Sequence, residues 1–371
     1  MLNFKEIKNK NFYYNALFYD FIFNFPKVAN HYFYDYGQIK SFKKHLKYIN
    51  KYFDLKTRKD ISKILKEQNT KYGCSKQTLE NIDNLRENDT MVVIGGQQPG
   101  LFTGPVFTIY KIITIIKLSA YLSSALNIKV VPVFWNASDD SNINAVNNVY
   151  ILDNKRNISE ISLFKEELLQ REDKKRYSDI LVSSDVILNK IDRMVSTLPS
   201  TDFTESIKIF LKRCVKNTEK IKYEEKLKGC IHLNDFFSVI ISELFAEYGL
   251  IVIDPSESRI KKLAQNIFVF DIQNHKSIEN AIKNSDVELR SQGYHSQIKV
   301  EEDAMNFYIV KNGIRSKLRK TSDGFYSLEG KKIKKEELLK FIESKPQDIS
   351  PNVITRPIIE GTILPVLATI C

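Results

Sequence analysis

Cysteine is scarce in this sequence, and its placement argues against a cysteine-ligated metal centre. The four cysteines are Cys74, Cys214, Cys230 and Cys371. None forms a Cys-x-x-Cys pair, and none lies near two histidines at the spacing of a zinc site. We therefore expect reduced intracellular thiols and no bound metal.

Two kinds of apolar segment are also missing. The first residues, MLNFKEIKNKNF, contain no apolar stretch of the signal-peptide type. No uninterrupted run approaches the roughly 20 apolar residues of a membrane span. These absences predict a cytoplasmic protein without a membrane segment.

The excess of positive charge is diffuse rather than gathered in one arm. The chain has 371 residues, 43% of them hydrophobic, which is enough for a sizeable core. Its net charge is +11, and the Lys and Arg residues are spread along it. Such an excess can attract nucleic acid or anionic metabolites without specificity. Charge alone supports a nucleic-acid-binding α/β protein, and we do not favour that alternative.

The order of apolar segments predicts an α/β fold with a doubly wound parallel sheet. Residues 90–94 form an apolar strand, residues 106–126 an apolar helix and residues 129–135 a second strand. Strand, helix and strand in this order are a βαβ unit. The helix is apolar on nearly every side, which predicts a position deep inside the protein. We expect Thr103 or Gly104 to cap its start.

Later segments add a further strand and a small β-rich region. Residues 234–247 are expected to form a helix that leads into a strand at 250–254. Residues 294–328 alternate between polar and apolar, with turns at Asn312-Gly313 and Asp323-Gly324. This pattern is a hairpin signature.

Three of the apolar strands end in unusual loops, which predicts where a ligand binds. The strand at 90–94 ends in GGQQPG, the strand at 130–135 in NASDDSN, and the strand at 250–253 in Asp254-Pro255. If the strands are parallel neighbours, the three loops share one rim of the sheet. Ligands of open α/β sheets bind at this carboxyl edge.

The first loop has the parts of an anion cradle. Gly95, Gly96 and Gly100 allow backbone torsions and close approaches that other residues do not. Backbone N–H groups next to a helix start favour a phosphate or a carboxylate, and Gln97 and Gln98 add side-chain donors and acceptors. The loop matches neither Walker A nor Gly-x-Gly-x-x-Gly, so dinucleotide binding is not indicated. The alternative is an ordinary tight turn between strand and helix.

Charged side chains near the second loop and the chain's end are further candidates. Adjacent carboxylates at Asp139 and Asp140 can hold an ammonium group, a sugar hydroxyl or Mg²⁺, or act as a base. The alternative is a pair of helix-capping acids. Arg356 could bind a carboxylate or phosphate bidentately, or form a surface salt bridge. The histidines occur in no catalytic pattern and are expected to be structural: His31, His45, His232, His275 and His295.

Several motifs resemble one family in the same order. Residues 92–111, VVIGGQQPGLFTGPVFTIYK, look like the signature of the bacillithiol biosynthesis cysteine-adding enzymes, the BshC family. The PVFW strand at 132–135 and the acidic loop follow. The remaining matches are ELFAEYGL at 243–250, Asn306-Phe-Tyr308 with Gly313 and Arg315, and SPNVITRP at 350–357. The resemblance covers most of the chain and is weakest over 155–230.

The resemblance implies both a fold and a reaction. The implied fold is a Rossmann-like core related in shape to class I aminoacyl-tRNA synthetases. The implied activity is that of a ligase, which adds L-cysteine to the amine of glucosaminyl malate in the last step of bacillithiol biosynthesis. A free carboxylate does not readily acylate an amine, so activation is expected, with ATP as the candidate cofactor. Full-length members imply a homodimer whose coiled coil is absent from this chain.

The same resemblance guides the assignment of site residues. Asp140, together with Asp139, is expected to orient or deprotonate the attacking amine. The glycine loop is expected to bind an anionic part of a substrate, while Asn352 and Arg356 steady a carboxylate. The predicted substrate-binding residues are Gly96, Gln97, Gln98, Gly100, Thr103, Asn352 and Arg356.

Two departures from the family pattern leave an alternative open. The family's acidic loop usually reads Ser-Glu-Asp-His-Asp, whereas here Ser141 and Asn142 follow Asp140 in place of the His and Asp that could carry protons. Family members also continue beyond the position of Cys371 into a Gly-rich segment and a coiled coil. The alternative expectation is a degenerate, truncated member that binds ligand without catalysis.

Pattern and resemblance together divide the chain into segments. The expected division is 1–88, an N-terminal helical segment packed on the core; 89–154, the first βαβ half of a Rossmann-like core; 155–233, a helical insertion; 234–293, a second core segment; 294–348, a small β-rich insertion; and 349–371, a core strand that is truncated relative to the family.

Overall fold

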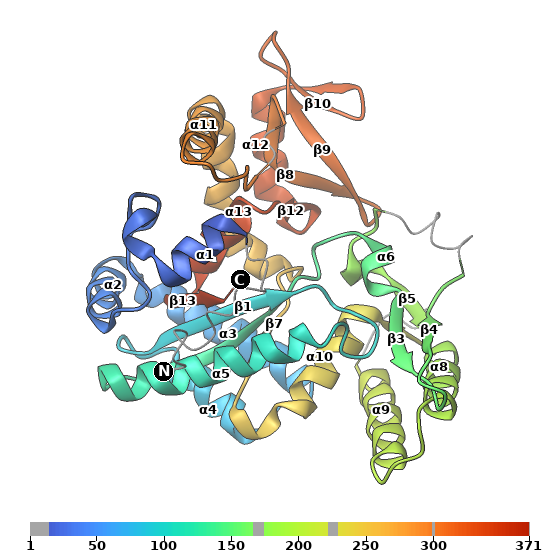
Figure 1. Ribbon diagram of the computed structural model, residues 1–371. Coiled ribbons are helices and arrows are strands. Elements are labelled where there is room, and N and C mark those ends of the chain that lie inside the picture. Colours follow the sequence, from blue (N-terminus) through green and yellow to red (C-terminus); the bar gives the residue numbers. More distant parts are fainter. Residues whose placement is uncertain (1–14, 166–173, 222–228, 299–300, 371) are drawn as a thin grey trace.

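The central element of the fold is a parallel four-stranded sheet. The structure is a computed structural model, which describes residues 15–165, 174–221, 229–298 and 301–370 (Figure 1). The strand order is β13-β1-β2-β7, and every pairing is parallel. The strands are β1 (Met91–Gln97), β2 (Val130–Asn136), β7 (Ile251–Ile253) and β13 (Val366–Ile370). This sheet confirms the α/β class and the Rossmann-like core.

Alternation of side chains along β1 explains why the sheet is covered on both faces. Met91 and Val93 belong to one hydrophobic core, and Val92 and Ile94 belong to the other. Successive side chains of a strand point to opposite faces, so an unbroken apolar run needs cover on both sides. All residues of β2 are buried, as this arrangement requires.

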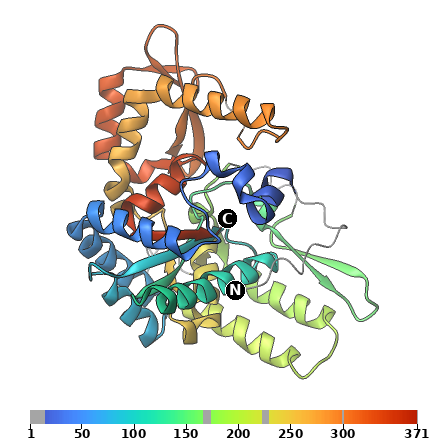
Figure 2. The same cartoon turned by 60° about the vertical axis from the view of Figure 1, so that its left-hand side comes forward.

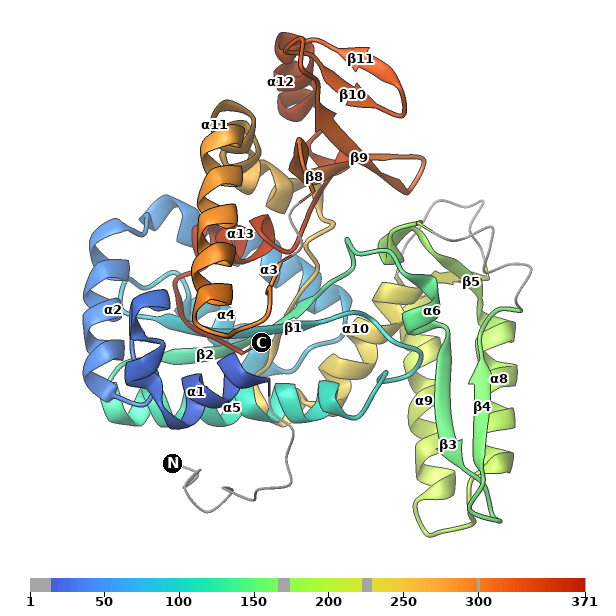
Figure 3. The same ribbon diagram turned by 45° about the horizontal axis from the view of Figure 1, so that its top comes forward.

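Helices cover both faces of the sheet, and each face receives helices from both halves of the chain (Figure 3). One core contains side chains from α2 (Ile39–Tyr52), α5 (Phe107–Leu126) and α10 (Leu233–Leu244). The other contains side chains from α3 (Leu55–Lys71), α4 (Lys76–Asn84), α11 (Ser258–Ser291) and α13 (Thr355–Ile363). The outlying short helices are α1 (Ala16–Phe23), η2 (Phe25–Lys27), η3 (Ala29–His31) and η6 (Ala246–Tyr248).

Helix α5 is not packed deep inside the protein, so that expectation was wrong. Its buried residues form one stripe, and Val106, Phe107 and Tyr110 next to its start are 67%, 50% and 66% exposed. The helix is the outermost layer over β1 and β2, which needs one apolar face only. Its N-cap is Val106 and no side chain caps it, so the expected Thr103 or Gly104 cap was also wrong.

Helix α5 also has the composition of a membrane span. Among the described helices it alone is long and apolar enough to cross a bilayer. The helix connects β1 to β2 and packs against both strands. A crossover helix that packs one face against the sheet of an α/β protein can have the same length and composition, so we assign it that role.

The segment after β2 combines short strands with helices at one side of the sheet (Figure 2). A hairpin of β3 (Asn148–Leu152) and β4 (Ile158–Ser162) is followed by the antiparallel pair β5 (Leu181–Ser183) and β6 (Cys230–His232). Its helices are α6 (Ile143–Val146), η4 (Tyr177–Asp179), α8 (Ser184–Thr197) and α9 (Thr204–Glu219). Residues 155–233 therefore contain strands in addition to the helices expected there.

A second, antiparallel sheet stands above the carboxyl edge of the first. Its order is β11-β10-β9-β8-β12. Asn312 and Gly313, with φ of 52° and 79°, form the turn between β8 and β9, which confirms the predicted hairpin. The elements are β8 (Ala304–Lys311), β9 (Ile314–Lys320), β10 (Tyr326–Leu328), β11 (Lys331–Ile333), α12 (Lys335–Ser344), η7 (Pro346–Asp348) and β12 (Ile349–Pro351).

Candidate active site

The loops after β1, β2 and β7 share one rim, as the sequence predicted. The side-chain amide of Gln98 donates a hydrogen bond to Asp140 Oδ2 at 2.6 Å, which joins the first loop to the second. Ser138 Oγ donates to Asp254 Oδ1, which joins the second loop to the third. Asn234 also donates to Asp254, at 2.8 Å. The parallel order of the strands brings these loops together.

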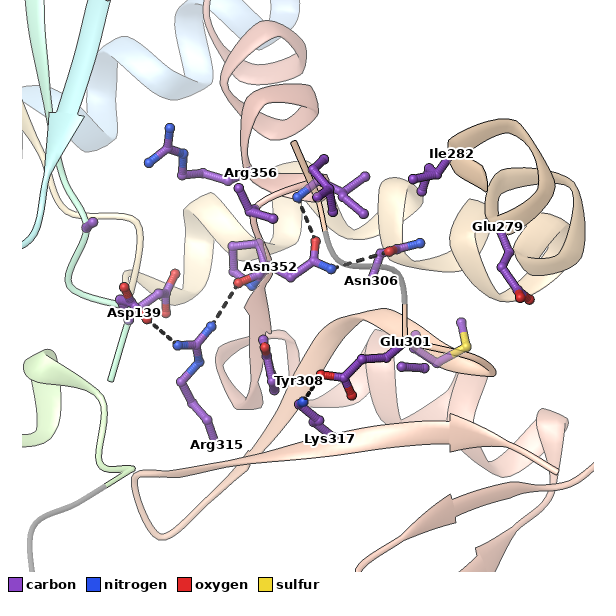
Figure 4. A pocket seen from close by; sticks show the side chains of 18 of the residues that line it. Asp139, Glu279, Ile282, Glu301, Asn306, Tyr308, Arg315, Lys317, Asn352 and Arg356 are labelled. Atoms are coloured by element: carbon purple, nitrogen blue, oxygen red, sulfur yellow. Dashed lines mark hydrogen bonds and ion pairs between the residues drawn. The ribbon is translucent and has the colours of Figure 1, made fainter. Parts of the chain in front are cut away.

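A cavity of about 400 Å³ opens between this rim and the small antiparallel sheet (Figure 4). Trp135 and Asp140 line it from the rim, and Tyr308 and Arg315 line it from the small sheet. Further wall residues come from α11 and from the start of α13. A pocket of this size is suited to a small molecule.

An ion pair connects the two sides of the cavity. Arg315 Nη1 lies 2.5 Å from Asp140 Oδ1, and Nη2 donates to the backbone oxygen of Pro351 at 3.1 Å. The guanidinium carbon is 4.2 Å from the centroid of the Tyr308 ring, which is a cation–π contact. Arg315 and Tyr308 belong to the family motifs in the sequence, but no role for either side chain was predicted. The sequence pattern that could have indicated this pair is the Asn-x-Tyr motif at 306–308, followed by a hairpin turn and Arg315.

Asp139 also lines the cavity, but its carboxylate belongs to a separate, buried charge network. Its carboxylate accepts a hydrogen bond from the Lys261 ammonium, and Arg176 Nη1 lies 3.7 Å from its other oxygen. Asp139 is 4% exposed and Lys261 is 2% exposed. Burial lowers the pKa of Lys261, an effect that the adjacent Asp139 carboxylate opposes. The two adjacent aspartates therefore have different surroundings.

The glycine loop lies beside the cavity. Among the described residues that line the cavity, none comes from the segment Gly96 to Gly100. Gly96 has no positive φ, so the expectation of a backbone torsion that only glycine adopts was wrong. The expected close approach of another group to the Gly96 backbone is confirmed. A Cβ on Gly96 would lie 2.9 Å from the backbone oxygen of Trp135. A Cβ on Gly100 would lie 2.4 Å from Gly104 Cα. Thr103 is half-buried in the turn that follows.

Lys111 is a cation that contacts this loop and was not predicted as a site residue from the sequence. Its ammonium donates to the backbone oxygen of Gly96 at 3.1 Å and to Gln97 Oε1 at 3.3 Å. It lies on α5, one turn in from the helix start, within the quoted family signature. Lys111 therefore orients the first loop from the helix side.

Asn352 and Arg356 line the same cavity as Asp140. The Asn352 side-chain oxygen accepts from the backbone N–H groups of Ile354 and Thr355 at 2.9 and 3.0 Å, which orders the turn into α13. Arg356 Nε lies 3.2 Å from Glu360 Oε1. Burial raises the pKa of Glu360 to about 7, and Arg356 opposes the shift.

The fold and the site define a Rossmann-like α/β protein with a charged small-molecule cavity at the carboxyl edge of its sheet. The model of the family "Bacillithiol biosynthesis BshC, N-terminal Rossmann-like domain" matches residues 2–371. The chain therefore belongs to the BshC family.

Curated relatives carry the same family name. A protein of Geobacillus kaustophilus (strain HTA426) named "Putative cysteine ligase BshC" is 31% identical over 315 residues, which are 84% of this chain and 55% of the relative. A relative of the same name from Bacillus cytotoxicus is 30% identical over 324 residues, 86% of this chain and 57% of the relative. The chain thus spans about half the length of the curated relatives it matches.

Proposed function

We propose that this chain carries the substrate cavity of a cysteine ligase that adds L-cysteine to the amine of glucosaminyl malate in the cytoplasm. The observation that carries the proposal is the mixed charge of the cavity, whose lining combines the Asp140 carboxylate with three cations, Arg315, Lys317 and Arg356. Glucosaminyl malate has one ammonium group and two carboxylates, so its charges match such a cavity. The names of the relatives supply the reaction.

Arg356 is the proposed anchor of a malate carboxylate. Its side chain is 33% exposed at the cavity wall and forms an ion pair with the buried Glu360. A planar guanidinium can bind a carboxylate through two parallel hydrogen bonds. Lys317 lines the cavity from β9 and pairs with Glu301, so it offers a second cation.

Asp140 is the proposed partner of the sugar ammonium group. Arg315 and Gln98 hold its carboxylate in place, and its side chain is 37% exposed. The carboxylate is thus fixed at the cavity wall, where it can accept hydrogen bonds from an ammonium group. Asp139, which is locked to Lys261, is proposed to position the loop that carries Asp140.

The bond that forms joins the cysteine carboxyl carbon to the sugar nitrogen. One carboxyl oxygen must leave, and we propose that it leaves on a phosphoryl or adenylyl group derived from ATP. The amine loses two protons in all when it becomes a neutral amide. The residues of this chain bind and orient the substrates, and they hold the amine near Asp140.

Calorimetric titration of the purified chain with glucosaminyl malate tests the proposal. Asp140→Asn and Arg356→Gln should each weaken binding roughly ten- to a hundredfold, because each removes one charge-assisted contact. Arg259→Gln is the matched control, since Arg259 pairs with Glu67 and Glu257 and does not line the cavity. Equal binding by all the variants would refute the assigned site.

Mass spectrometry after incubation with cysteine, glucosaminyl malate and ATP separates the two functions that the sequence left open. Ligated product means an active ligase. Binding without product means a family member that retains only the cavity, in which Ser141 and Asn142 do not replace the family's His and Asp.

A further inference from the structure

Three metal-ligand side chains meet at the end of the cavity distant from Asp139. His275 and Glu279 come from α11, and Asp303 precedes β8. One donor atom from each lies within 4.8 Å of the other two. His275 and Glu279 also line the cavity, and Figure 4 shows Glu279 on the side opposite Asp139. The cluster therefore connects the long helix to the small sheet.

The imidazole of His275 is buried without a hydrogen-bond partner. It is 3% exposed, and neither ring nitrogen has a partner among the residues that the structure describes. An unsatisfied buried polar group is costly, so both ring nitrogens of this imidazole are available to a ligand. The backbone of Asn274 departs from helical torsions, with φ of −116° and ψ of 16°, immediately before His275.

The spacing of the two helical ligands suits a shared ion. His275 and Glu279 are four residues apart, so they lie on the same face of α11. His275 Nε2 and Glu279 Oε2 are 4.0 Å apart. Ligand atoms about 2.0–2.2 Å from Zn²⁺ in a tetrahedral site are roughly 3.4 Å apart, so small side-chain rotations bring the set together.

Two lysines compete for the Glu279 carboxylate. Lys276 and Lys283 lie 3.2 and 2.5 Å from its oxygens, and their contacts lower the pKa of Glu279. A bound cation would displace the Lys283 ammonium, which still has Glu302 at 3.3 Å. This competition lowers the affinity for a cation. When a cation binds, the exposed Lys276 can turn to solvent and Lys283 can pair with Glu302.

We propose that His275, Glu279 and Asp303 bind a divalent metal ion of the zinc type, with water completing the coordination. An imidazole with two carboxylates suits Zn²⁺ better than Mg²⁺ or Ca²⁺, which prefer oxygen ligands alone. The ion fastens α11 to the strand that carries the cavity residues Asn306 and Tyr308. This inference departs from the sequence expectation of no metal, which rested on cysteine and histidine spacing.

Equilibrium dialysis of the chelator-treated full chain against Zn²⁺ tests the site. We expect one equivalent of Zn²⁺ to bind. His275→Leu and Asp303→Asn should each weaken binding by about tenfold or more, because each removes one direct ligand. Asp303 is exposed and has φ of 57°, a conformation that Asn also tolerates, so this variant should fold normally. Glu288→Gln removes an exposed carboxylate of α11 outside the cluster and is the matched control.

Co²⁺ in place of Zn²⁺ gives an independent readout. A cobalt ion held by one nitrogen and two oxygens should give visible absorption bands that are absent from Asp303→Asn and retained in Glu288→Gln. Equal Zn²⁺ binding by the wild type and Asp303→Asn would overturn the proposal. So would the absence of any bound Zn²⁺ in the folded wild-type chain, or a stronger response to Mg²⁺ than to Zn²⁺.

Discussion

Replacing Asp139 with Asn should destabilise the protein strongly, because the change leaves the Lys261 ammonium buried without its countercharge. The two side chains are in direct contact, and both are buried. Arg176 adds a second cation 3.7 Å from the same carboxylate. Arg176 keeps Asp179 2.6 Å from its Nε, whereas Lys261 would lose the carboxylate that it contacts.

The expected cost follows from the burial of this pair. Removing one partner of a buried ion pair costs about 3–5 kcal/mol, because the other charge remains desolvated. Lys261 can lose its proton instead, since burial already lowers its pKa, and this release limits the cost. We therefore expect Asp139→Asn to lower the free energy of unfolding by about 3 kcal/mol at neutral pH.

A double-mutant cycle and an exposed control separate charge from packing. Lys261→Met removes the cation and keeps an unbranched apolar chain, so Asp139→Asn should cost less in that background than in the wild type. Asp83→Asn is the control, because Asp83 pairs with Lys66 at 3.0 Å with both side chains more than 40% exposed. Its cost should stay below about 1 kcal/mol.

Urea denaturation followed by fluorescence provides the measurement. The chain has one tryptophan, Trp135, which is 1% exposed and should report unfolding of the sheet. An Asp139→Asn variant as stable as Asp83→Asn would refute the reasoning. If that variant also lost turnover while it still bound substrate, Asp139 would have the proton-carrying role that the sequence suggested.

Two further predictions concern Glu360 and Gly96. Because burial raises the pKa of Glu360 from 4.5 to about 7, its contribution to stability is complete below pH 4.5 and is lost as the pH rises through 7. The loss should total about 3 kcal/mol, and urea titrations should show that Glu360→Gln removes this pH dependence. Equal pH dependence of the wild type and Glu360→Gln would contradict the raised pKa of this carboxyl. Gly96→Val should lower the free energy of unfolding by about 1–3 kcal/mol, because its Cβ would lie 2.9 Å from the Trp135 backbone oxygen. A wild-type unfolding midpoint for Gly96→Val would contradict that steric argument.

Much of the fold follows from local patterns in the sequence. The apolar run at 91–94 places alternate side chains in two cores, which requires a sheet covered on both faces. Strand, helix and strand then predict parallel neighbours, and parallel neighbours place Gln98 and Asp140 on one rim. The Asn312-Gly313 turn likewise specifies a hairpin, because both residues adopt positive φ at little cost. These features depend only on residues near one another in the chain.

Only the tertiary structure decided how the two aspartates differ. Asp139 meets Lys261 and Asp140 meets Arg315, partners that are 122 and 175 residues away in the sequence. Neighbouring carboxylates look alike in a sequence, whereas burial and countercharge, which come from distant segments, determine what each can do. The exposed face of α5 was likewise decided by the tertiary structure. Hydropathy shows how apolar a helix is, but not how many layers of the fold cover it. The charged cavity likewise exists because the small sheet folds back over the rim, an arrangement set by long-range packing rather than by local periodicity.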